Sequence, residues 1–149
     1  MTIKQQLYKQ CEDFLNKRLE AIQHTISEIQ NSLLSETKSS AGDKHETGRA
    51  MLQLEREKAG KQLAEIQKVK ETLSKINIEK NSETISLGCL VYTTTLNYFI
   101  AISAGEINYN NDKFYAISPS TPIAKLLLSK KVGEQVTFRS LTFTIVKIE

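Results

Sequence analysis

Both prolines of this chain, Pro119 and Pro122, lie in one short segment, so the first 118 residues contain none. Because proline is the residue that most strongly interrupts an α-helix, long helices are permitted in this part of the chain. Apolar residues recur here at steps of three, four or seven, which place them on one face of a helix. The first such stripe consists of Leu7, Cys11, Leu15, Leu19, Ile22, Ile26, Ile29 and Leu33, and the second of Leu52, Ala59, Leu63, Ile66, Val69, Leu73 and Ile76.

A polar break of small residues separates the two stripes, at residues 37–43. Breaks of this composition commonly join two antiparallel helices. Since the other faces of both helices carry Glu, Lys, Arg and Gln, the apolar stripes can be buried only against each other. The sequence therefore predicts a coiled-coil hairpin with arms of about 30 to 35 residues, which extend roughly 50 Å at about 1.5 Å per residue.

The residue types change after Asn77, where β-branched and aromatic residues become frequent. We place a polar linker at residues 81–83, with one domain at 1–79 and a second at 84–149. Residues 122–129 are predicted to form a short helix, with Thr121 as its N-cap and Pro122 in its first position. Strands are predicted at residues 85–95, 98–103, 113–117, 136–138 and 141–148. The expected fold class is α+β, a long antiparallel helical hairpin followed by a small β-rich domain.

Composition and charge exclude several classes of protein. Cys11 and Cys89 belong to no C-x-x-C pair, which argues against a disulfide framework or a zinc ribbon, and we expect both thiols to be reduced. The net charge of +3 is small and acids alternate with bases, unlike in a direct nucleic-acid binder. No apolar run reaches the roughly 18 residues that span a bilayer, and the start lacks the apolar core of a secretory signal. We expect a cytoplasmic protein without membrane contact.

Asp43 and Glu46 stand at the predicted turn, three residues apart at the head of the second helix. One interpretation is structural, because an acid at the N-cap with Glu three residues later matches a capping box. The other is functional: carboxylates at the end of a narrow rod are exposed, and in a partner's cavity they could share a Mg²⁺ ion or its water. The two interpretations are compatible, since a carboxylate that caps an amide keeps lone pairs for a metal.

Two segments of the chain resemble the bacterial Gre-type transcript cleavage factors. The first is Gly42-Asp43-x-x-Glu46, which is similar to the acidic tip motif of that family. The second is the ungapped stretch from Ile117 to Glu134, ISPSTPIAKLLLSKKVGE, which is similar to its C-terminal signature. In this order and separation they span essentially the whole chain.

The resemblance implies an N-terminal coiled coil followed by a domain with an FKBP-like fold. It also implies an accessory factor, not itself an enzyme, that enters the secondary channel of bacterial RNA polymerase and stimulates cleavage of backtracked RNA, which rescues stalled complexes. Asp43 and Glu46 would be the catalytic acids, which hold a second Mg²⁺ near the 3′ end of the nascent RNA and orient the attacking water. We expect the free protein to be a monomer without a bound metal or other cofactor.

A docking role for residues 118–134 follows from the same resemblance. This segment would contact the rim of the polymerase channel. The residues assigned to the contact are Ser118, Pro122, Ile123, Lys130 and Gly133.

The residues after the acidic pair depart from the family pattern, which continues with asparagine, alanine, an acid and tyrosine. Here the residues are Thr47, Gly48, Arg49 and Ala50. The missing aromatic residue and the reversed charge leave open a second hypothesis, a regulator that binds the same channel without promoting cleavage. Gly48 lowers helix stability by about 1 kcal/mol relative to alanine, and either lets the tip flex or is a tolerated surface glycine.

Other features near the tip have an ordinary interpretation beside a functional one. A basic side formed by Arg49, Arg56, Lys58 and Lys61 could meet RNA phosphates, but the intervening acids are typical of a solvated helix face. His45 could bind a metal or carry a proton, although an exposed histidine usually does neither.

Two hypotheses come from different classes of protein. An FKBP-like domain could be a prolyl isomerase or a peptide-binding module, but such sites are normally lined with aromatic residues and this chain has no Trp. A structural coiled-coil scaffold would require the apolar stripes to pair between chains.

Overall fold

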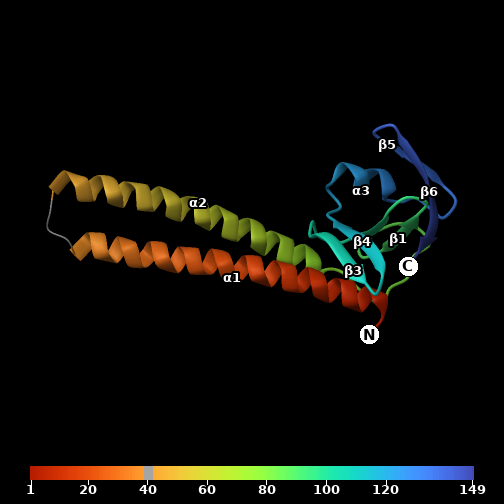
Figure 1. Cartoon of the computed structure of the whole chain (residues 1–149), viewed down its shortest axis with the longest axis horizontal. Helices are drawn as coiled ribbons and strands as arrows, with labels where there is room; N and C mark the ends of the chain where they lie inside the picture. The colour runs from red at the N-terminus through yellow and green to blue at the C-terminus, as the bar shows by residue number, and fades with distance from the viewer. Residues whose placement is uncertain (39–41) are drawn as a thin grey trace. The chain divides into compact units, whose positions relative to one another are not determined.

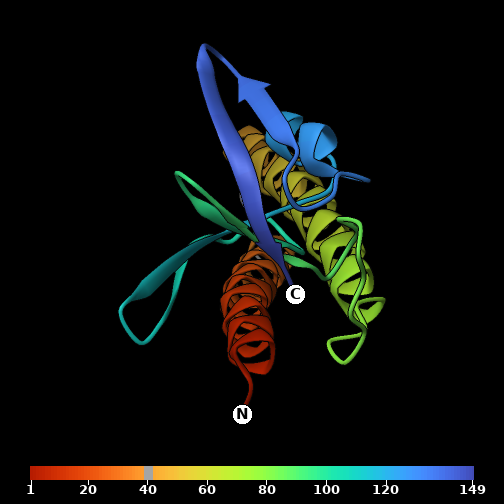
Figure 2. The ribbon, with the colours of Figure 1, turned by 90° about the vertical axis from the view of Figure 1, so that its right-hand side faces the viewer.

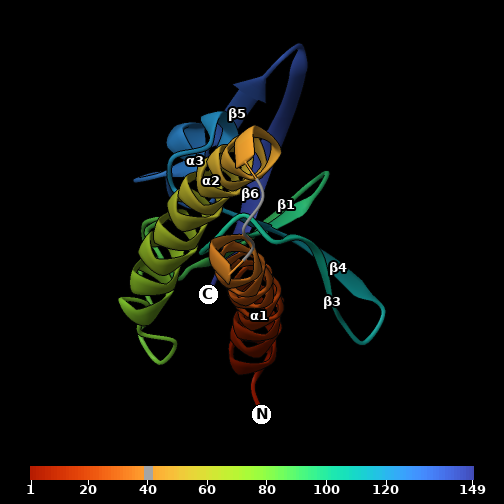
Figure 3. The same cartoon turned by 90° about the vertical axis from the view of Figure 1, so that its left-hand side faces the viewer.

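Two long helices form the first part of the chain. The computed structural model describes residues 1–38 and 42–149, and for residues 37–46 it describes no side chains. Helix α1 (Ile3–Lys38) has 36 residues and helix α2 (Gly42–Ser74) has 33, and they lie side by side as a hairpin (Figures 1 and 3). The predicted hairpin is therefore confirmed, and helix extends further into the predicted break at 37–43 than the sequence suggested.

Residues 15–70 form one compact unit, whose interior is made by the two predicted stripes. Ile22 and Ile26 are buried on α1, as are Ala59 and Ile66 on α2. Residues at the edges of the stripes, such as Leu19 and Leu63, are only half-buried, because two helices alone cannot enclose a wide apolar face.

The second compact unit contains residues 1–14 and 71–149. It joins the first turns of α1 and the end of α2 to the β-rich part of the chain. The domain limits of 1–79 and 84–149 were placed at a change of residue type and stay a prediction. So does the FKBP-like assignment.

A six-stranded sheet dominates this unit, with the strand order β3-β4-β2-β1-β6-β5. All neighbouring strands are antiparallel except β2 and β4, which are parallel. The β3–β4 and β5–β6 hairpins stand at its two ends (Figure 2). The strands are β1 (Leu90–Thr93), β2 (Asn97–Ile100), β3 (Gly105–Tyr109), β4 (Asp112–Ile117), β5 (Gln135–Phe138) and β6 (Leu141–Ile148).

The predicted strands are confirmed at 141–148 and, within one or two residues at each end, at 113–117 and 136–138. The strand predicted at 98–103 ends earlier, at Ile100. The prediction of one strand over 85–95 was wrong for its first half. There the chain turns at residues 86–89, with Cys89 N donating to Ser86 O at 3.1 Å, and Gly88 has a φ of +94°.

Strand β3 was missed, because only Ile107 in it is buried and the burial pattern gives no clear alternation. It pairs with β4 from Gly105↔Ala116 to Tyr109↔Asp112, around a two-residue turn that begins at Asn110. Asn110 has a φ of +54°, a conformation that asparagine tolerates better than most residues. Consecutive asparagines at 110 and 111 were the available turn signal.

One face of the sheet packs with helix α3 (Pro122–Leu127) to form the core of this unit. Thr121 caps α3 as predicted, since its Oγ1 accepts a hydrogen bond from Ala124 N at 3.3 Å. The helix ends two residues before the predicted limit, and Ser129 follows with a φ of +69°. The buried members of the core are Ile85, Cys89, Val91, Tyr98, Ile100, Ala124, Leu127, Val136, Phe143 and Ile145.

Leu141 departs from the predicted alternation of β6. Phe143 and Ile145 are buried as expected, but Leu141 is 68% exposed. It stands at the tip of the β5–β6 hairpin, where Arg139 and Ser140 make the tight turn with φ of +55° and +76°.

Both cysteines are buried and free, as expected, and burial raises the pKa of Cys11 to about 12. Among the described residues, no helix is long and apolar enough to cross a membrane.

Candidate functional site

The acidic pair belongs to the start of α2. The helix begins at Gly42, so Asp43 and Glu46 are its second and fifth residues. Their side chains, and that of His45, lie outside the described part of the structure. Their roles as catalytic acids and metal ligands therefore stay predictions, as does the capping box.

Near the tip, the two helices approach each other at Gly48 of α2 and Glu36 of α1. A Cβ atom built on Gly48 would lie 3.5 Å from Oε1 of Glu36, which is in the last turn of α1. The carboxylate of Glu36 thus rests against the second turn of α2. At 3.5 Å this would be an ordinary van der Waals contact, so the packing does not require glycine at position 48.

Charged side chains along α2 alternate in sign and are mostly in solvent. Arg49, Lys58 and Lys61 are exposed and Arg56 is half-buried, while Glu55 and Glu57 are exposed between them. Among the described residues of this unit, the large apolar side chains that are exposed are those of Leu34, Met51 and Leu54.

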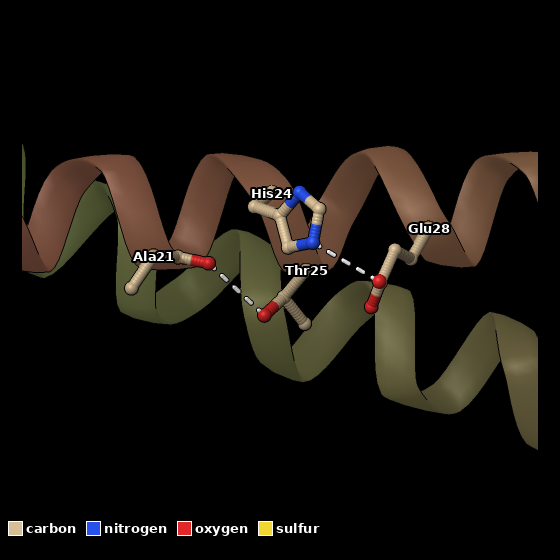
Figure 4. A network of polar contacts seen from close by, with 4 residues as sticks. All are labelled: Ala21, His24, Thr25 and Glu28. Atoms are coloured by element: carbon tan, nitrogen blue, oxygen red, sulfur yellow. Dashed lines mark hydrogen bonds and ion pairs between the residues drawn. The ribbon is translucent and has the colours of Figure 1, made fainter.

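Farther along α1, two contacts stay within the helix (Figure 4). Oγ1 of Thr25 donates to the carbonyl of Ala21 at 3.0 Å, and Nε2 of His24 lies 3.0 Å from Oε1 of Glu28. Both partners of the second pair are largely exposed, so the pair adds little to stability. A groove of about 490 Å³ adjoins this stretch and is lined by Arg18, Ala21, Ile22, Thr25, Gln62, Glu65 and Ile66.

The predicted docking segment begins with a tightly bonded turn. Ser118 O accepts from Thr121 Oγ1 at 2.8 Å and from Thr121 N at 3.1 Å. Ser118 Oγ lies 2.8 Å from Ser120 Oγ and accepts from Ser120 N at 3.2 Å. Its hydroxyl therefore organises the turn ahead of α3.

The other residues predicted to dock follow on or after α3. Pro122 is exposed in the first turn of the helix and Ile123 is half-buried against the core. Lys130 is half-buried, and its carbonyl accepts from Ile85 N at 2.9 Å. Gly133 has a φ of +92° and donates its N–H to Ile145 O at 2.8 Å. The segment is thus fixed at both ends, and whether these residues contact a partner stays a prediction.

Exposed apolar side chains accompany this segment. Leu126 is 39% exposed on α3 and Val132 is 55% exposed after it. Lys125 and Lys131 are exposed beside them. Sequence reasoning did not single out either Leu126 or Val132.

Three polar side chains in the first turns of α1 bond backbone groups elsewhere in the second unit, and no sequence pattern predicted them. Lys4 donates from Nζ to Lys80 O at 2.9 Å, and Tyr8 donates from its hydroxyl to Leu73 O at 3.2 Å. Gln10 bonds both backbone groups of Asn108. Burial lowers the pKa of Lys4, against the opposing effects of Cys89 and Glu149.

Within the described residues, no three or more His, Cys, Asp or Glu side chains are grouped so that they could hold a metal ion. The predicted metal ligands, Asp43 and Glu46, fall outside that description.

No protein-family model and no curated protein matches the chain. Among solved structures it is similar to the crystal structure of GreA factor homolog 1 (Gfh1) of Thermus thermophilus, with 19% identity over 91% of this chain and 92% of that one, and a TM-score of 0.36. It is also similar to a structure of the transcription factor Gfh1, with 22% identity over 90% of both chains and a TM-score of 0.35. At this identity and TM-score, neither says what this chain binds or does.

Proposed function

We propose that this protein is a transcription elongation factor of the Gre type, which binds bacterial RNA polymerase through the secondary channel and stimulates cleavage of backtracked RNA. The observation that carries the proposal is the position of an Asp and a Glu at the start of α2, where two helices of 36 and 33 residues turn back on each other. A hairpin of this length is about 50 Å long at about 1.5 Å per residue, and it can carry two carboxylates into a cavity that a globular domain cannot enter.

The polymerase supplies what the free protein lacks. Carboxylate oxygens suit Mg²⁺, but two of them alone are a weak site, so metal binding needs the first metal and the RNA of the polymerase. In this arrangement Asp43 and Glu46 hold the second ion and orient the attacking water beside the RNA 3′ end. The protein acts as a monomeric accessory factor, and the residues after Ser118 dock on the channel rim.

The decisive experiment measures RNA cleavage in stalled complexes with purified polymerase. Asp43→Asn and Glu46→Gln keep the size of each side chain and remove its charge. We expect both variants to bind polymerase and to lose most of the stimulated cleavage. Asp13→Asn and Glu57→Gln remove a charge from exposed sites elsewhere on the same helices and should cleave normally. If Asp43→Asn and Glu46→Gln cleave as fast as the unmodified protein, the catalytic role is wrong.

Residues 47–50 favour a second function, a regulator that occupies the same channel without promoting cleavage. Arg49 stands where the Gre-type pattern has an acid, and the aromatic residue is replaced by Ala50. The same assay separates the two functions, since this regulator would slow elongation in the purified system and release no RNA fragment. Restoring the acid by Arg49→Glu should then raise cleavage from a low level.

A further inference from the structure

The two edge strands of the sheet, β3 and β5, differ in whether a side chain bonds their outer backbone groups. At β3, the side-chain amide of Gln10 covers one residue of the strand: Nε2 donates to Asn108 O at 2.6 Å, and Asn108 N donates to Oε1 at 3.2 Å. Gln10 therefore bonds both backbone groups of an edge residue, as a neighbouring strand would. At the other edge, no described strand lies outside β5, and no described side chain from outside the β5–β6 hairpin bonds its backbone.

The register shows which backbone groups of β5 are open. Gln135 faces Thr144, whose O accepts from Thr94 N at 3.0 Å and whose N donates to Thr94 Oγ1 at 3.1 Å. Both backbone groups of Thr144 thus point toward β1. In an antiparallel pair, facing residues bond each other through both groups or neither, so the N–H and C=O of Gln135 point away from β6.

The alternation continues along the strand. Ile145 N donates to Glu134 O at 3.0 Å, so Glu134 bonds to β6 and Gln135 does not. The backbone N–H and C=O of Val136 therefore point toward β6, and those of Thr137 point away from it. Val136 is 4% exposed and anchored in the core, whereas Gln135 and Thr137 are exposed. The outer edge of β5 consequently offers two donors and two acceptors on a strand that is held in place.

Charge around this edge is mainly positive. Lys130 and Lys131 precede β5, and Arg139 follows it with its guanidinium carbon 5.1 Å from the ring centroid of Phe138. The one acid nearby in sequence, Glu134, accepts from Lys131 N at 2.6 Å, so a single carboxylate stands against three cations. A strand added along β5 would run between cations at both ends.

We propose that the outer edge of β5 binds an extended, acidic segment of a partner protein by strand addition. Main-chain hydrogen bonds to Gln135 and Thr137 set the register of the added strand, and the flanking cations favour acidic residues in that strand. A second copy of this chain fits less well, because its own β5 edge carries the same excess of Lys130, Lys131 and Arg139 over the one acid Glu134 and so supplies few acidic partners. The inference goes beyond the proposed transcript cleavage, since neither Asp43 nor Glu46 takes part.

The first test uses the full chain labelled with ¹⁵N and a capped six-residue peptide of alternating glutamate and valine. With the peptide at about ten times its Kd, amide exchange at Gln135 and Thr137 should slow by about tenfold, because only about a tenth of the molecules stay free. Chemical-shift changes should centre on β5. Raising the salt concentration should weaken binding, and a peptide of alternating lysine and valine should not bind.

A pair of variants tests the backbone N–H of Gln135, which points away from β6. Gln135→Pro removes one N–H that makes no bond to β6, and proline is tolerated at such edge positions. Gln135→Ala changes the side chain and keeps the N–H. We expect the proline variant to bind the acidic peptide about three- to tenfold more weakly and the alanine variant to bind as the unmodified chain does. Circular dichroism checks that both variants are folded.

The proposal is overturned by any of four results: shift changes that centre on another surface, equal binding of the two peptides, equal binding by the two folded variants, or concentration-dependent self-association that protects the same two amides. If Gln135→Pro does not fold, the exchange measurement on the unmodified chain decides alone.

Discussion

Ile76 and Gly88 approach so closely that no side chain fits between them. A Cβ atom on Gly88 would lie 2.9 Å from Cγ2 of Ile76, well inside the contact distance of two carbon atoms. Gly88 also has a φ of +94° and donates its N–H to Ile100 O at 2.7 Å. Ile76, two residues after the end of α2, is thereby packed onto the turn that leads into β1.

Replacing Gly88 with alanine should lower the free energy of unfolding by about 2 to 4 kcal/mol, from left-handed backbone strain together with the clash against Ile76. Gly133→Ala is the matched control, because its φ is +92° and nothing lies within 4 Å of the added methyl group. The control should lose only the strain, about 1 to 2 kcal/mol. Chemical denaturation measures both variants, and equal losses would contradict the packing account.

Gln10→Ala should expose the backbone of Asn108 to solvent. The loss of two hydrogen bonds predicts a decrease of about 1 to 2 kcal/mol in stability and faster amide exchange at Asn108. Gln6→Ala, at an exposed site on the same helix, should change neither. Unchanged exchange at Asn108 in Gln10→Ala would mean that the edge is protected by something other than this amide.

Tyr92→Phe should reveal a pH dependence above pH 10. Burial, and then the negative charge of Glu149, raise the pKa of Tyr92 above its ordinary value of 10.0, and its hydroxyl donates to Oε2 of Glu149 at 3.1 Å. A raised pKa means that the folded state holds this proton after the unfolded state has lost it. Stability from Tyr92 is therefore full below pH 10.0 and falls as the pH rises toward the folded pKa.

The variant should be about 1 to 2 kcal/mol less stable than the unmodified protein at pH 7, and this difference should shrink above pH 10. Denaturation curves at pH 7, 9 and 11, collected for both proteins, test the sign. A difference that grows with pH would refute the assignment.

Thr121→Ala should loosen the start of α3. It removes the acceptor for Ala124 N and the donor to Ser118 O, and the loss of a helix N-cap costs about 1 kcal/mol. Thr121→Ser keeps the hydroxyl and should retain most of the stability. Thermal unfolding of the two variants distinguishes the cap from the lost methyl group, since a serine variant as unstable as the alanine variant would assign the effect to packing.

Ser140→Gly should stabilise the β5–β6 hairpin. Ser140 has a φ of +76°, which glycine adopts without the penalty that a side chain meets. Relief of the left-handed strain, about 1 to 2 kcal/mol, exceeds the extra backbone entropy that glycine loses on folding, so we expect a net gain of about 0.5 to 1 kcal/mol in the free energy of unfolding. Thr142→Gly places glycine two residues later, inside β6, and should destabilise; a loss of stability in Ser140→Gly would show that the serine side chain contributes to the turn.

Local patterns predicted much of the fold. The spacing of Ile22, Ile26 and Ile29 was enough for α1, because helix periodicity is a property of neighbouring residues. Thr121 and Pro122 marked the start of α3 for the same reason. Strand β3 was missed and the strand at 85–95 was predicted too long, because strands depend on partners that are distant in sequence.

Part of the candidate site was predicted from the sequence, and part was seen only in the structure. The acids at 43 and 46 were found from residue types and spacing, and the segment after Ser118 from its resemblance to the Gre-type factors; their roles rest on the proposed function. The structure added Glu36 beside Gly48 and the exposed Leu126 and Val132, which no local pattern predicts.

The sequence by itself determined two amphipathic helices, the acids at the start of the second, and the capped helix near the C-terminus, since each depends on residues within a few positions of one another. Only the tertiary structure decided the strand order, the contact of Gln10 with Asn108 and the outward direction of the Gln135 and Thr137 backbone groups. These features join residues up to 98 positions apart. Such pairs depend on the packing of the whole core, which a pattern of neighbouring residues does not predict.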